Sequence, residues 1–309
     1  MLLVANGSVF TRNAQAPFIP NGAVAIDGDT IVEVGPECEL KAKYPDAEYV
    51  DAQGNLIMSG LINCHTHIYS GLARGLAIKG CNPTNFLENL EQQWWKIDDN
   101  LTLDGTKASA YATILDSIRD GVTTIFDHHA SFCEIPGSLF TIKDAAQELG
   151  MRSCLCYEVS DRRGQEKCDQ AIAENAEFAQ WAAKERRDND NHMIAAMPNV
   201  GWCEAMTMLF ENNVKMASKY FDRKLGVLEA GAAADVIVMD YKPFTPLSEE
   251  NIDGHMLFGM MGKNCRTTII NGRVLYKDRE FVGIDEDKIN AWTMAESKKL
   301  WSTLNDRAY

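Results

Sequence analysis

The chain has 309 residues, of which 46% are hydrophobic and 24% charged, as is typical of a globular protein with a sizeable core. Lysine and arginine number 30 against 44 aspartates and glutamates, which gives a formal net charge of −14. Nucleic acids and anionic membrane surfaces are bound through basic patches, so this balance predicts no nucleic-acid partner and no membrane partner.

The N-terminal residues and the cysteines favour a cytoplasmic location. The start of the chain lacks the basic segment of a signal peptide, and no apolar run approaches the roughly 18 residues that cross a membrane. The nine cysteines are an odd number and are scattered along the chain. We therefore expect reduced thiols in a cytoplasmic protein.

The first 57 residues resemble a series of short strands joined by tight turns. Four strands are expected, over Leu2–Ala5, Ser8–Thr11, Ala23–Ile26 and Thr30–Val34. The first two flank Asn6-Gly7 and the last two flank Asp27-Gly28-Asp29. Asn-Gly and Asp-Gly favour hairpin turns because these residues tolerate positive φ. A small antiparallel sheet is the expected product.

From residue 56 onward the pattern changes to alternating strands and helices. Strands are expected over Leu56–Asn63, Val122–Phe126, Ser153–Val159 and His192–Met197, and helices over 104–120, 139–149 and 166–187. This alternation is typical of parallel βα units. It stops after Met197, where one more helix is expected over Trp202–Tyr220.

Two short segments, one near each end of the chain, have similar sequences. Asn6-Gly7-Ser8-Val9 resembles Asn271-Gly272-Arg273-Val274, which lies in a region of further strands. We predict an α/β protein with three parts: a partial (β/α) barrel of about four βα units at 58–221, a small β-sandwich domain formed from 1–57 and 222–285, and a C-terminal helix at 286–309.

His65 and His67 come directly after the first strand of this barrel. Residues two apart in a strand face the same side, so their imidazoles lie together. Imidazole nitrogen is a preferred ligand of borderline divalent metals, and the carboxyl ends of barrel strands are where active sites are built. The alternative is a pair of polar side chains hydrogen-bonded to backbone or water.

Several segments carry a family resemblance. They are Met58–His67, Leu72–Leu76, Asp120–Asp127, Ala230–Asp240 and Ile269–Tyr276. In combination they resemble the amidohydrolase superfamily, in its aminohydrolase and chlorohydrolase branch, and are most similar to the SsnA-type aminohydrolases.

The resemblance implies a barrel that binds one or two divalent metals through His65 and His67, with zinc expected first and iron as the alternative. It also implies a hydrolase that acts on a C–N bond of a small heterocyclic substrate, with deamination of a purine-like ring as the expected reaction. Metal-bound water, whose pKa falls to about 7, would attack the ring carbon.

The sequence departs from that family in one large respect. Only six histidines are present, and no segment resembles the histidine motifs of the fifth and sixth barrel strands or the aspartate of the eighth. A full barrel takes roughly 250 residues, far more than lie between Leu56 and Tyr220. The alternative is therefore an inactive truncated remnant that binds metal weakly and forms homo-oligomers through unpaired sheet edges.

Four further residues are candidates for substrate binding: Arg74, Asp98, His128 and His129. Arg74 could hold an anionic or carbonyl group, with a surface ion pair as the alternative. Asp98 ends Trp95-Lys96-Ile97-Asp98, which departs from the Trp-Pro-x-Glu segment of related deaminases by losing the proline and one carbon of the acid. The two histidines follow the second strand, and the alternative for them is bonding to loop backbone or solvent.

Overall fold

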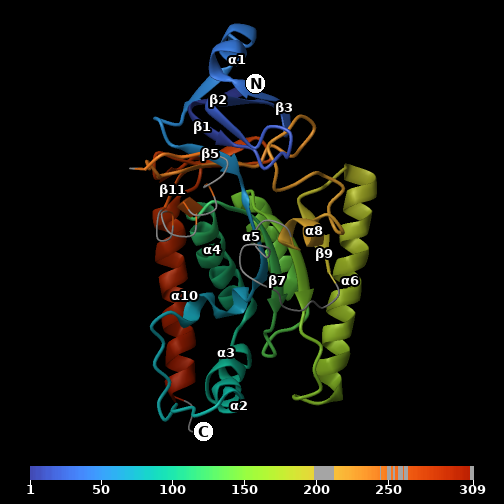
Figure 1. Ribbon diagram of the computed structural model, residues 1–309. Helices are drawn as coiled ribbons and strands as arrows, with labels where there is room; N and C mark the ends of the chain where they lie inside the picture. The colour runs from blue at the N-terminus through green and yellow to red at the C-terminus, as the bar shows by residue number, and fades with distance from the viewer. Residues whose placement is uncertain are drawn as a thin grey trace. The chain divides into compact units, whose positions relative to one another are not determined.

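The computed structural model describes residues 1–197, 212–243, 245–248, 252, 255–256, 260 and 264–306. The chain divides into two compact units, each built from separate segments. The first comprises Met1–Asn63, Ser117–Thr124 and Cys203–Ile284, and the second comprises Cys64–Asp116, Ile125–Trp202 and Asp285–Tyr309. Figure 1 shows the elements coloured along the chain.

A nine-stranded sheet combines strands from both ends of the chain. Its strands are β1 (Leu2–Phe10), β2 (Phe18–Asp27), β3 (Thr30–Pro36), β4 (Glu48–Asp51), β5 (Leu56–Ser59), β10 (Val236–Met239), β11 (Cys265–Ile270), β12 (Arg273–Lys277) and β13 (Glu280–Phe281). The order is β13-β12-β11-β10-β5-β1-β2-β3, with β4 beside β1. The sheet is mixed rather than antiparallel, because β1 pairs in parallel with β4 and β5. Helix α1 (Glu37–Lys43) follows β3.

The expected hairpin at Asn6-Gly7 is wrong, because β1 continues through both residues. Asn6 has a φ of 59°, and the pairing with β2 shifts register between Val4 and Gly7. The positive φ that Asn tolerates is therefore used in a bulge. The first half of β1 pairs with β4 and the second half with β5. The bulge thus changes which neighbour the strand meets.

The hairpin expected at Asp27-Gly28-Asp29 is confirmed, because Asp27 pairs with Thr30 across the β2–β3 turn. Asn271-Gly272 forms a further hairpin, which connects β11 to β12. The core beside them mixes residues from both chain ends, including Val4, Val24, Ile31, Val236 and Ile269. The similar segments near the two ends of the chain therefore lie in one sheet and share one core.

A second sheet has four strands in the order of the sequence: β6 (Leu61–Thr66), β7 (Val122–His129), β8 (Arg152–Tyr157) and β9 (Ile194–Ala196). The connections run through α4 (Leu103–Arg119), α5 (Ser138–Leu149) and α6 (Gln165–Asn189). β8 pairs with β9 in parallel. The predicted alternation of strand and helix is confirmed here, and the fold is α/β.

The single strand expected over Leu56–Asn63 is divided at Gly60. β5 lies in the nine-stranded sheet and β6 in the four-stranded sheet. Gly60 N donates to the Asp235 carbonyl, whereas Leu61 N donates to the Gly121 carbonyl. A Cβ on Gly60 would lie 2.2 Å from the Thr123 side chain. Only glycine allows this close approach at the point where the chain changes sheets.

The remaining elements are short, apart from the last helix. They are the 3-10 helix η1 (Ile68–Ala73), α2 (Phe86–Asn89), the π-helical turn η2 (Leu90–Trp94), α3 (Trp95–Asp98), α8 (Asn213–Ala217) and α10 (Glu286–Asp306). The expected C-terminal helix is confirmed as α10. Of the helix expected over Trp202–Tyr220, residues 202–211 lie outside the described ranges. Within those ranges, no helix has the length and apolar character to cross a membrane.

Candidate metal and substrate site

Three imidazoles gather where β6 and its neighbour β7 end. The ring centroids of His65 and His67 are 4.8 Å apart with an interplanar angle of 89°. The ring of His128 lies 5.7 Å from that of His67, at 87°. His65 lies in β6 and His67 directly after its last residue, and β7 supplies the third ring because the two strands are adjacent.

The position of one proton on His67 follows from its hydrogen bond. His67 Nδ1 lies 3.0 Å from the His128 carbonyl oxygen. A carbonyl can only accept, so Nδ1 carries the hydrogen and donates it. The lone pair of the neutral ring is then on Nε2. Metal-binding histidines are commonly fixed in this way by a second partner on the other nitrogen.

The turn after His67 is fixed by several contacts. Ile68 N donates to Asp127 Oδ1 at 2.6 Å, and Ser70 N donates to the His67 carbonyl at 3.0 Å. Ser109 Oγ donates to the Ile68 carbonyl. Burial raises the pKa of Asp127 to about 8, although the bond from Ile68 N opposes this rise. Asp127 thus ties the end of β7 to the residue after the histidine pair.

His128 and His129 face opposite sides of β7. His129 is 0% exposed, and its ring lies 5.7 Å from Tyr157 and 6.3 Å from Tyr69. Burial lowers its pKa to about 3, so the ring is neutral at ordinary pH. Of the two histidines predicted as substrate contacts, only His128 therefore joins the cluster of His65 and His67.

A second polar cluster surrounds Asp98 at the end of α3. Arg162 Nη2 lies 2.6 Å from Asp98 Oδ2 and 3.3 Å from Glu158 Oε1. The side chains of Asp98 and Arg162 are only 2% and 10% exposed. The Arg162 guanidinium also stacks over Phe132 at 4.0 Å. Burial raises the pKa of Asp98 to about 7, against the lowering effect of Arg162.

Tyr69 connects the two clusters. Its ring centroid lies 5.6 Å from that of His67. Its phenol has a pKa raised first by burial and then by the negative charges of Asp98 and Glu158. The imidazoles and the buried acid therefore belong to one region of the second unit. Tyr69 was not among the predicted site residues, because only the folded chain brings it beside His67.

Arg74 is not brought into this region by its described contacts. It forms an ion pair with Asp116 and its side chain is 66% exposed. The surface ion pair, which was the alternative to substrate binding for Arg74, is therefore present in the structure. Its predicted role in substrate binding stays a prediction.

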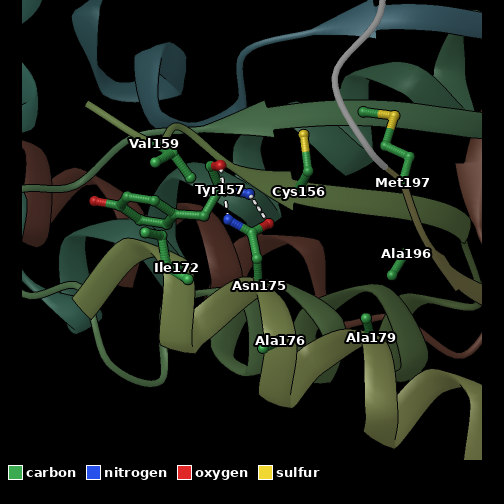
Figure 2. A pocket seen from close by; sticks show the side chains of 9 residues that line it. All are labelled: Cys156, Tyr157, Val159, Ile172, Asn175, Ala176, Ala179, Ala196 and Met197. Carbon is green, nitrogen blue, oxygen red and sulfur yellow. Dashed lines mark hydrogen bonds between the residues drawn. The ribbon is translucent and has the colours of Figure 1, made fainter. Parts of the chain in front are cut away.

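A separate cavity of about 520 Å³ lies between β8, β9 and α6 (Figure 2). It is lined by Cys156, Tyr157, Val159, Ile172, Asn175, Ala176, Ala179, Ala196 and Met197. Asn175 fixes one wall by accepting from Tyr157 N and donating to the Tyr157 carbonyl, each at 2.9 Å. The lining is mainly apolar and includes none of the clustered histidines.

The donor set in the first cluster suits a divalent metal. Neutral imidazole is a preferred ligand of zinc, and His67 already presents Nε2. Among the described residues, no group of three or more His, Cys, Asp or Glu side chains could hold a metal ion as these side chains stand. The pair of His65 and His67 suits a metal by ligand chemistry and by the proximity of its two rings.

Comparison with known proteins defines the class of this chain. Residues 56–208, which contain β6, β7 and the imidazole cluster, match the model of the amidohydrolase family. The chain therefore contains an amidohydrolase family domain. Residues 22–47 additionally match a bacterial imidazolonepropionase-like composite domain.

The relatives within this family are named as deaminases. A 5'-deoxyadenosine deaminase of Methanococcoides burtonii is 29% identical over 184 residues, which cover 59% of this chain and 39% of that protein. A 5-methylthioadenosine/S-adenosylhomocysteine deaminase of Syntrophobacter fumaroxidans is 32% identical over 152 residues, covering 49% and 32%. The alignments thus span about two fifths or less of the length of these relatives.

Solved structures share the fold at low identity. The zinc complex of atrazine chlorohydrolase TrzN from Arthrobacter aurescens TC1 aligns with a TM-score of 0.68 and 16% identity, covering 96% of this chain and 100% of that one. A zinc-bound adenosine deaminase from Xanthomonas campestris aligns with a TM-score of 0.64 and 13% identity, covering 97% and 98%. At such identity the likeness shows the fold alone.

Proposed function

We propose that this chain is a metal-dependent hydrolase that removes an amino group from a purine-like heterocycle. The observation that carries the proposal is the imidazole cluster of His65 and His67, which lies within the segment that matches the amidohydrolase family. The relatives named as deaminases of adenine nucleosides support the substrate class.

In this proposal His65 and His67 hold a divalent metal, with zinc first and iron as the alternative. The metal, when bound, supplies a water molecule that is deprotonated near neutral pH. His67 is held in position through Nδ1 by the His128 carbonyl, so Nε2 keeps its lone pair. Zinc in two of the related solved structures supports the choice of metal.

Asp98 is proposed as the residue that binds the substrate beside the metal. Its Oδ1 has no hydrogen-bond partner among the described residues, whereas Oδ2 is held by Arg162. A buried carboxyl with one unused oxygen can accept a hydrogen bond from a hydroxyl or amino group of a ligand. Arg162 acts through Asp98 as a positioning residue.

The proposal also covers the architecture that the two sheets belong to. We infer that the four-stranded sheet is the first part of a (β/α) barrel and that the nine-stranded sheet forms a small β-sandwich. The strand order and the core shared by the two chain ends support this inference. A cytosolic location is part of the proposal, supported by the eight cysteines of the described ranges, each of which is a thiol and not half of a disulfide.

The test is ammonia release by the zinc-loaded protein. We expect turnover with at least one of 5'-deoxyadenosine, 5-methylthioadenosine, S-adenosylhomocysteine and guanine, and its loss in His65→Ala and His67→Ala. His192→Ala is the matched control, because that ring pairs with Asp190 outside the cluster. Stoichiometric zinc without turnover on any of these compounds would overturn the proposed reaction. The comparisons lend no support to the alternative of an inactive remnant.

A further inference from the structure

The side chain of His129 is a buried polar group whose hydrogen bonds are not made. It is 0% exposed, and neither Nδ1 nor Nε2 has a hydrogen-bond partner among the described residues. Because burial lowers the pKa of His129 to about 3, its ring is neutral and carries one donor and one acceptor. Buried polar groups are nearly always hydrogen-bonded, and leaving one unpaired costs stability. The two unused nitrogens therefore point to a bound molecule as their partner.

His129 lies beside the region where the substrate is proposed to bind. Its ring lies 6.3 Å from that of Tyr69 and 5.7 Å from that of Tyr157. Burial raises the pKa of both phenols, and the charge of Asp98 adds to the rise, so Asp98 is near both tyrosines. Tyr69 is partly exposed and its ring also contacts His67, at 5.6 Å. A turn of the Tyr69 ring would therefore open His129 to a ligand bound beside His67.

We propose that His129 stays unpaired in the free protein in order to hydrogen-bond the polar edge of the bound heterocycle. A purine-like ring presents nitrogen acceptors and N–H donors around its edge, and a neutral imidazole can pair with either kind. Asp98 Oδ1, which also has no partner among the described residues, would take a second donor of the same ligand. The inference rests on the proposed function for its substrate class, and it adds His129 to Asp98 as a substrate contact.

A ligand-binding role and a packing role for His129 predict different results for His129→Leu. Replacing an unpaired buried polar group by an apolar one of similar size is neutral or stabilising, so the melting temperature without ligand should stay the same or rise. Ligand affinity should fall, because one polar group of the ligand is then buried without a partner. We expect the Kd for inosine and for hypoxanthine, which are products of purine deamination, to rise about 5–150-fold. Calorimetry on the full chain with zinc present measures both constants.

Two further variants make the result specific. His129→Gln returns a donor and an acceptor, so it should bind both compounds more tightly than His129→Leu does. Ser153→Ala removes another buried hydroxyl that has no partner among the described residues, near the start of β8 and away from Tyr157. It should leave both Kd values unchanged. His129→Phe replaces His129→Leu if the latter does not fold, and a lower melting temperature in both apolar variants would overturn the inference.

The outcomes separate this inference from the proposed function. Unchanged Kd values in His129→Leu, or no binding of either compound by the unaltered chain, would overturn the role of His129. The proposed reaction is judged independently, by ammonia release. Binding that depends on His129, without ammonia release, would overturn the proposed reaction and leave the role of His129 standing.

Discussion

Two neighbouring arginines make the same kind of ion pair in different surroundings. Arg162 pairs with Asp98 where both side chains are at most 10% exposed. Arg163 pairs with Asp99 through two of its nitrogens, but its side chain is 40% exposed. Removing one partner of a buried pair leaves an uncompensated charge, whereas an exposed pair is screened by water.

We therefore expect Arg162→Met to lower the free energy of unfolding by about 3 kcal/mol, because Asp98 would stay buried without its partner. Arg163→Met should lower it by about 0–1 kcal/mol. Denaturant titration of the two variants gives both values. Equal losses would show that burial does not distinguish the pairs.

The raised pKa of Asp98, about 7, predicts a pH dependence of stability. The folded state binds the Asp98 proton more tightly than the unfolded state does, so this contribution is complete below about pH 4 and is lost as pH rises through 7. The free energy of unfolding should therefore fall less between pH 5 and pH 8 in Asp98→Asn than in the unaltered chain. A steeper fall in Asp98→Asn than in the unaltered chain would contradict a raised pKa for Asp98 in the folded state.

The residues that the sequence could place are those governed by local alternation. The spacing of His65 and His67 along β6 is enough to put their rings together. The same alternation separates His128 from His129. The Asp98–Arg162 pair could not be predicted, since its members are 64 positions apart and meet only in the folded chain.

The hairpin turns of β2–β3 and β11–β12 touch within the first unit. A Cβ on Gly272 would lie 1.7 Å from the Gly28 carbonyl oxygen, and Gly272 has a φ of +75°. Gly54 has nearly the same φ, +76°, but nothing within 4 Å of its Cβ position. The two glycines therefore share a backbone requirement and differ in packing.

Gly272→Ala is expected to lower the free energy of unfolding by about 2–4 kcal/mol, which combines left-handed backbone strain with a clash against main chain. Gly54→Ala should cost about 1 kcal/mol from the strain alone. Chemical denaturation of both variants measures the difference. If Gly272→Ala lowers the free energy of unfolding no more than Gly54→Ala does, the β2–β3 and β11–β12 turns are not in contact.

The elements that were predicted well have local signals. α4 and α5 end before Gly121 and Gly150, which both adopt positive φ, and the β2–β3 turn has its Asp-Gly. The bulge at Asn6 and the division at Gly60 were missed for a shared reason. Each depends on a strand or side chain that is distant in sequence. A glycine or asparagine permits positive φ or close packing, but it does not by itself indicate whether a turn, a bulge or a change of sheet forms there.

On the scale of the whole molecule, the four-stranded sheet has β6 and β9 as its outer strands in the described part of the chain. Unpaired strand edges favour association between copies. We expect light scattering to show concentration-dependent dimers or larger species. A sharp monomer peak with a cooperative melt at every concentration would contradict this.

The metal centre is the feature on which the account depends, and an anomalous difference map at the zinc edge tests it most directly. Crystals of the zinc-loaded chain should show one peak per molecule at about 2.0–2.1 Å from Nε2 of His67, with His65 as the second protein ligand. Zinc sites only elsewhere, with no peak at these two imidazoles, would contradict it.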